Sequence, residues 1–178
     1  MDIEKLEGLF KNSKEEAYKF FTDNYDEAVK LIESLNSYQL DNIVLKGLFY
    51  NPDILVQYAD FFTTQAKAKK SGYFNHLISY NAVISKIIKA YEPFILDNFC
   101  FSTDYYENLE LAIFKIDNYT GKVLDILKKA PANKKIKVVY QLRTLMLPDE
   151  FTELIRTELK TAKGDYQADL KRELKHME

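Results

Sequence analysis

The scarcity of residues that interrupt helices is the feature that most constrains how this chain can fold. Five glycines and four prolines are spread over 178 residues. Between them, apolar residues recur three and four positions apart, which is the spacing of one face of an α-helix. The stripe from Leu40 to Leu48 has this spacing, and so does the longer series from Tyr73 to Tyr91. The longer series predicts a helix near the centre of the core.

Residues that begin and end helices occur at regular intervals along these stripes. Ser13 begins a capping-box pattern and Asn51 stands just before a proline, which predicts a helix start at each position. Pro148 marks another start, and Gly164 is expected to close the helix that follows it. We expect Pro93 to end the helix that contains Tyr91.

Two segments are ambiguous at this level. Residues 94–101 are apolar and irregular, so they fit either a short helix or an extended segment. Residues 135–147 include Val138-Val139-Tyr140, which favours a strand. The apolar residues of this second segment keep a helical phase, with Ile136, Val139 and Tyr140 expected to face inward, so we favour a helix there.

The expected fold is therefore all-α. No Gly/Ser-rich or Pro-rich linker divides the chain, so we expect residues 1–178 to form a single all-helical domain. The number of stripes predicts about eight to ten helices, arranged as an irregular multi-helix bundle or as a compact α-solenoid.

Composition excludes several classes of protein. Apolar residues make up 47% of the chain and charged residues 29%, which is typical of a folded globular protein rather than a disordered one. Cys100 is the single cysteine, so no disulfide can form within the chain. We expect no membrane partner and no signal peptide, because no apolar run approaches about 18 residues and the first residues are charged. A cytoplasmic location is expected.

The chain is poor in residues that carry familiar chemistry. It has two histidines and no glycine-rich phosphate loop. Glu173 and His176 have the spacing of half a di-iron site, but a matching second half is missing and both side chains are expected to be solvated. Cys100 and His76 form the one possible Cys–His couple, and the flanking phenylalanines favour a buried, inert thiol. We expect no catalytic residues, no metal, no cofactor and no enzymatic activity.

Charge is distributed in blocks although the net charge is −2. Residues 1–62 and 92–119 are acidic, whereas residues 63–91 and 120–147 are basic. The lysines of the basic blocks gather near expected helix ends, where a positive charge complements the helix dipole. The sequence pI of about 5.8 also argues against nucleic acid as a partner.

Acidic residues next to tyrosines are the most suggestive pattern for binding. Tyrosine offers a rigid apolar ring with a polar tip, and acids steer a basic partner toward the surface. The first candidate group stands at an expected helix start and comprises Asp104, Tyr105, Tyr106, Glu107 and Glu110. The second group comprises Glu15, Glu16, Asp23, Asp26 and Glu27.

These patterns predict a small protein-binding module. The concrete version is an inhibitor or immunity-type protein that neutralises a toxin or another enzyme, such as a nuclease, whose surface is basic. One alternative is a helical enzyme or ligand-binding protein with an internal pocket lined by Tyr and Phe. Another is a structural subunit of a helical assembly. The sequence leaves the identity of the partner and the oligomeric state open.

Overall fold

The computed structural model describes residues 2–35, 48, 51–67, 85–101 and 109–177, and all regular structure in these ranges is helical. The predicted all-α class is confirmed. Eleven helices lie in the described ranges, slightly more than expected, because turns divide some continuous apolar stripes. The stripe that contains Leu55 and Phe62 is one example, since Tyr58 separates two helices there. No helix in these ranges is long and apolar enough to cross a membrane.

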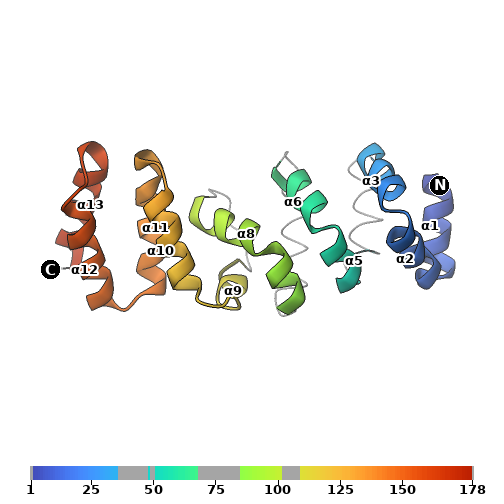
Figure 1. The fold of residues 1–178 in the computed structure, drawn as a ribbon, viewed down its shortest axis with the longest axis horizontal. Coiled ribbons are helices and arrows are strands. Elements are labelled where there is room, and N and C mark those ends of the chain that lie inside the picture. The colour runs from blue at the N-terminus through green and yellow to red at the C-terminus, as the bar shows by residue number, and fades with distance from the viewer. Residues whose placement is uncertain (1, 36–47, 49–50, 68–84, 102–108, 178) are drawn as a thin grey trace. The chain divides into compact units, whose positions relative to one another are not determined.

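Two units of structure can be distinguished by their internal contacts. The first unit comprises Met1–Phe94 and Tyr106–Lys115, and the second comprises Ile95–Tyr105 and Ile116–Glu178. The helices of both units are labelled in Figure 1. The single-domain organisation stays a prediction, as does the choice between an irregular bundle and an α-solenoid.

The first unit contains mainly short helices that pack on their neighbours along the chain. In this unit α2 contacts α1, α3 and α5. Its described helices are α1 (Ile3–Asn12), α2 (Lys14–Asp23), α3 (Tyr25–Ser34), α5 (Pro52–Gln57), α6 (Ala59–Lys67), the beginning of α8 (Ser85–Phe101) and α9 (Leu109–Ile113).

Side-chain caps fix where three of these helices begin. The Ser13 hydroxyl accepts a hydrogen bond from the backbone N–H of Glu16 at 3.3 Å at the start of α2. The Asn51 side chain accepts from the N–H groups of Asp53 and Ile54 at 3.1 and 3.2 Å, with a proline at the first position of α5. Asp2 caps α1 in the same way. Each cap satisfies amides that have no partner inside the helix, and the predicted starts at Ser13 and Asn51 are confirmed.

Aromatic rings form the core of the first unit. Phe21 and Tyr58 are fully buried, with ring centroids 6.2 Å apart in an edge-to-face arrangement. The buried hydroxyls of Tyr58 and Tyr91 are satisfied by main-chain carbonyls: Tyr58 donates to Phe21 O and Tyr91 donates to Leu55 O, both at 2.7 Å. The rings that contact Phe21 or Tyr58 are those of Phe10, Phe20, Tyr25, Phe61 and Phe62.

The second unit is built from longer helices and a mainly aliphatic core. Its helices are the end of α8, α10 (Tyr119–Lys129), α11 (Ala132–Leu145), α12 (Pro148–Leu159) and α13 (Gly164–Met177). Consecutive helices form the hairpins α10–α11 and α12–α13, and α11 contacts both helices of the second hairpin (Figure 1). Fully buried core residues include Val123, Val138, Val139, Leu142, Ile155 and Leu170.

The prediction that Pro93 ends a helix is wrong, because Pro93 lies inside α8. A proline in a helix interior costs about 3 kcal/mol, since it removes a hydrogen bond and crowds the preceding turn. Most of the apolar residues that follow it are buried, and Phe99 and Cys100 are at most 5% exposed. Burying one large apolar side chain contributes about 1.5–3 kcal/mol. This burial offsets the cost of the proline, so residues 94–101 are helical rather than extended.

The helix over residues 135–145 is confirmed as part of α11, but its predicted inward face is wrong at one position. Tyr140 is 39% exposed, whereas Val138 and Val139 are fully buried. Val138 and Leu142 are four residues apart, so they share the buried face. Tyr140 lies at the edge of that face, near Arg172 of α13.

Gly121 lies in the first turn of α10. The preceding Asn118 has a left-handed backbone with φ of 52°. A Cβ atom at position 121 would lie 2.6 Å from the side-chain amide of Asn118. The glycine therefore leaves room for the residue that starts the helix.

Candidate functional site

The second predicted group of acids lies on α2 and α3, and all five of its side chains are exposed. Glu15 and Glu16 stand in the first turn of α2, whereas Asp23 ends that helix. A rise of 1.5 Å per residue puts Glu15 and Asp23 roughly 12 Å apart along the axis of α2. The structure therefore divides the group into two parts, at opposite ends of α2.

The turn between α2 and α3 gathers the other three acids of the group. Asp26 and Glu27 are in the first turn of α3, where a negative charge is favoured by the helix dipole. Asp23, three residues before Asp26, forms an ion pair with Lys19 one turn earlier on α2.

Tyr25 stands among these acids, at the first position of α3. Its ring is 36% exposed and is stacked on the buried Tyr58 with 4.6 Å between ring centroids and a tilt of 32°. We name the exposed surface formed by Asp23, Tyr25, Asp26 and Glu27 the Tyr25 face.

Hydrogen bonds to main-chain carbonyls hold the turn that carries this face. The side-chain amide of Asn24 donates to Phe20 O at 3.0 Å, and the amide of Gln57 donates from α5 to Thr22 O at 3.3 Å. Burial raises the pKa of Tyr58, and the neighbouring Tyr25 and Asp26 add to this effect. The phenol that supports Tyr25 therefore stays neutral and hydrogen-bonded throughout the physiological pH range.

Sequence reasoning named the acids of this face but missed Tyr25. The signal was present, because a tyrosine among acids at a helix start is the pattern that identified the first group. The support from Tyr58 could not be seen, because the two residues are 33 positions apart and meet through the packing of α2 and α5.

The first predicted group lies almost entirely outside the described residues. Asp104, Tyr105, Tyr106 and Glu107 fall in the range 102–108, and Glu110 belongs to α9 without a described side chain. Their role in partner binding stays a prediction.

The buried thiol of Cys100 has the surroundings expected of an inert cysteine. It is 1% exposed, and burial raises its pKa to about 12, with a smaller contribution from Asp97. A thiol with this pKa is almost entirely protonated at neutral pH, so it is a poor nucleophile. His76, the other member of the predicted couple, lies outside the described ranges.

The prediction that Glu173 is solvated is wrong. Glu173 is 6% exposed, and its carboxylate is 3.2 Å from a guanidinium nitrogen of Arg143 on α11. His176 is exposed, as predicted. Among the described residues, no group of three or more His, Cys, Asp or Glu side chains could hold a metal ion.

The lysines around the turn between α10 and α11 also differ from expectation. Lys128 and Lys129 are in the last turn of α10, where they complement the dipole. Lys134 and Lys135 are instead near the start of α11, at its positive end, and no side chain caps that start. A positive charge at this end is unfavourable, so the dipole does not explain the cluster.

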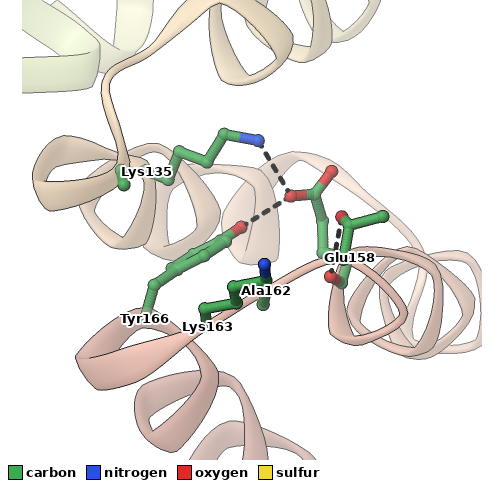
Figure 2. A pocket seen from close by; sticks show the side chains of 7 residues that line it. Lys135, Glu158, Ala162, Lys163 and Tyr166 are labelled. Carbon is green, nitrogen blue, oxygen red and sulfur yellow. Dashed lines mark hydrogen bonds and ion pairs between the residues drawn. The ribbon is translucent and has the colours of Figure 1, made fainter.

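A pocket of about 260 Å³ lies beside these lysines, between α11, the turn after α12 and the start of α13 (Figure 2). Glu158 is its central polar group. One of its carboxylate oxygens, Oε2, is 3.1 Å from Lys135 Nζ and accepts a hydrogen bond of 2.9 Å from the Tyr166 hydroxyl. Residues that line the pocket are Ala132, Lys135, Glu158, Thr161, Ala162, Lys163 and Tyr166.

The paired side chains of Lys135 and Glu158 are only partly accessible to water. The side chains of Lys135 and Glu158 are 22% and 16% exposed. The Lys135 ammonium also lies 5.7 Å from the centre of the Tyr166 ring. The pKa of Tyr166 is raised, mainly by burial and then by its hydrogen bond to Glu158. Local sequence patterns do not reveal this cluster, because Lys135 and Tyr166 are 23 and 8 residues away from Glu158.

Comparisons with known proteins do not assign this chain to a family. No protein-family model matches the chain, and neither the curated proteins nor the solved structures contain a significant match.

Proposed function

We propose that the protein acts by binding one protein partner that has a basic surface. In its concrete form, it is an inhibitor of the immunity type, which neutralises a toxic enzyme such as a nuclease by covering its basic cleft. The observation that carries the proposal is the partly exposed ring of Tyr25. It is stacked on the buried ring of Tyr58, and exposed acids flank it in the sequence.

The physical argument begins with the tyrosine. Binding costs less when an exposed anchor is already held in place, because little side-chain freedom is lost on association. The stack on Tyr58 and the hydrogen bonds of the α2–α3 turn restrict Tyr25 in this way. Tyrosine is also among the residues that most often contribute strongly to interfaces.

The acids supply selectivity for a basic partner. Complementary charges at an interface raise the association rate and disfavour partners of the same sign. Asp26 and Glu27 are exposed in the same first turn of α3 as Tyr25, so a basic partner that docks on this turn is attracted by their charge. The proposal includes a cytoplasmic location and action through binding rather than turnover.

Quantitative affinity capture from the native cell tests the proposal. The wild-type chain and a Tyr25→Ala variant are used as baits, and the recovered proteins are compared by mass spectrometry. We expect one basic protein to be recovered in stoichiometric amount by the wild type and to be reduced at least tenfold with the variant.

Tyr140→Ala is the matched control, because Tyr140 is a tyrosine of similar exposure, 39% against 36%. It lies on α11 in the second unit, whereas the acids of the Tyr25 face belong to the first. Recovery should be unchanged with this control, and the purified partner should lose activity when one equivalent of wild-type protein is added. Equal recovery with Tyr25→Ala and wild type would show that this face is not the binding site.

A further inference from the structure

The pocket around Glu158 in the second unit has a charge pattern that suits a small ligand. Lys135 and Lys163 bring two positive charges to its lining and Glu158 brings one negative charge, so the charged lining side chains carry a net charge of +1. Lys135 is already paired with Glu158 at 3.1 Å. Lys163 is exposed, and the described residues show no partner for its ammonium.

The rest of the lining is suited to an apolar body. The methyl groups of Ala132 and Ala162 and the ring of Tyr166 form much of the wall, and Figure 2 shows Tyr166 and Ala162 beside the Glu158 carboxylate. The volume of about 260 Å³ corresponds to roughly nine water molecules at about 30 Å³ each. A ligand of about nine non-hydrogen atoms would fit within it.

We propose that this pocket binds a small organic monoanion, a carboxylate attached to a flat apolar body. Lys163 is its main electrostatic partner, and Lys135 contributes from the opposite wall. The apolar body lies against Tyr166 and the two alanines. Glu158 acts as a positioning residue that holds Lys135 and Tyr166 in place through a single oxygen.

The proposal is independent of the Tyr25 face, because the two sites belong to different units. A protein that binds the anion but captures no partner would disprove the proposed function alone. A protein that captures its partner through Tyr25 but ignores the anion would disprove the pocket alone.

Benzoate is a suitable probe, because it has nine non-hydrogen atoms, a flat ring and one carboxylate. Binding to the full chain is followed by NMR titration of backbone amides, with the shifts mapped onto residues 132–135 and 161–166. We expect a Kd of about 1 mM, the range open to a ligand of this size in a partly open pocket. Benzylammonium, which has a similar body and the opposite charge, should leave these amides unchanged, and acetate should bind at least fivefold more weakly than benzoate.

Two variants and one control separate this site from general attraction to lysines. Lys163→Gln should weaken benzoate at least fivefold with an unchanged melting temperature, because Lys163 is exposed. Lys160→Gln is the control: Lys160 is exposed in the same turn but does not line the pocket, so its removal should change the affinity less than twofold. Glu158→Gln keeps the shape but removes the negative charge, so it should tighten benzoate binding severalfold.

Three results would overturn the proposal. Binding of benzylammonium with loss on Glu158→Gln would make Glu158 the ligand-binding group and a cation the ligand. Equal effects of the Lys160 and Lys163 variants would indicate attraction to surface charge without a site. Amide shifts spread beyond the pocket, or none at 20 mM benzoate, would show that the cavity takes no such ligand.

Discussion

The two units of this protein stabilise their helices by different means. In the first unit, buried rings such as Phe21 and Tyr58 pack edge to face, and the buried hydroxyls of Tyr58 and Tyr91 donate to main-chain carbonyls. In the second unit, the core is mainly aliphatic, and polar links between helices include the partly buried ion pairs of Lys135 with Glu158 and Arg143 with Glu173. The first unit therefore depends on aromatic packing, and the second combines packing with charge.

This difference indicates which changes in pH or sequence should lower the stability of each unit. A buried phenol that donates to a carbonyl is neutral at acid and neutral pH, so the stability of the aromatic core does not change with pH in that range. The core is destabilised instead by changes in side-chain volume and by the ionisation of its tyrosines in alkali. A partly buried ion pair responds to the loss of either partner, because the remaining charge is left in a poorly solvated place.

Truncation of the central ring should have the largest effect on stability. We expect Tyr58→Ala to lower the free energy of unfolding by about 3–5 kcal/mol, because it opens a cavity among the rings that contact Tyr58. Tyr58→Phe keeps the ring and removes the hydrogen bond to Phe21 O, so it should cost about 1 kcal/mol. Urea unfolding followed by circular dichroism measures both. Equal costs would contradict the view that ring packing dominates.

Alkaline pH should weaken the first unit next most strongly. Burial raises the pKa of Tyr58 and Tyr91 in the folded state, whereas both ionise near pH 10 when unfolded. The stabilisation is fully present below pH 10 and is lost as pH rises above it, by about 1.4 kcal/mol per tyrosine at pH 11. Urea unfolding measured between pH 9 and 11 should show a smaller loss of unfolding free energy for Tyr91→Phe than for the wild type. If the free energy of unfolding falls equally steeply with pH in both proteins, this linkage is wrong.

Removal of one member of an ion pair should destabilise the second unit by a smaller amount. Arg143→Ala leaves the carboxylate of Glu173 buried without its partner, and we expect a cost of about 1–3 kcal/mol. The cost stays below that of a fully buried pair, because Arg143 is 54% exposed. The double variant Arg143→Met/Glu173→Leu should recover most of the loss in urea unfolding. A double variant no more stable than the single one would show that the charges are essential to the packing.

Backbone freedom at two glycines should give the smallest effects, with opposite signs in the two units. Gly164 has a φ of +58° at the start of α13, so Gly164→Ala should cost about 1–2 kcal/mol. Gly8 lies inside α1 with open space around it, so Gly8→Ala should stabilise the chain by about 0.5–1 kcal/mol. Thermal unfolding of both variants provides the comparison, and a shift of the same sign for both would contradict the structure.

Local sequence signals predicted the class of fold and several of the helix starts. Ser13 and Asn51 are examples, because a cap depends on residues only two or three positions away. The prediction failed at Pro93, where the tertiary burial of the residues that follow the proline outweighed a local rule. The exposure of Tyr140 was missed for the same reason, since it depends on which face of α11 meets α12 and α13.

The candidate sites were less predictable than the fold. The acids near Tyr25 could be named from their spacing, but the support that Tyr58 gives to the ring could not. Glu158 could not be assigned to a site at all, because its contacts with Lys135 and Tyr166 exist only when three helices come together. Both sites are created by tertiary packing, which leaves no periodic trace in the sequence.

The association rate constant with the captured partner tests the central claim most directly. Surface plasmon resonance would compare the wild type with Asp26→Lys/Glu27→Lys, and with Asp149→Lys/Glu153→Lys on the exposed side of α12 as the charge-matched control. At low salt we predict a rate about tenfold slower for the first variant and unchanged for the control, with the difference disappearing near 1 M salt. Equal rates for all three proteins at low salt would contradict the account.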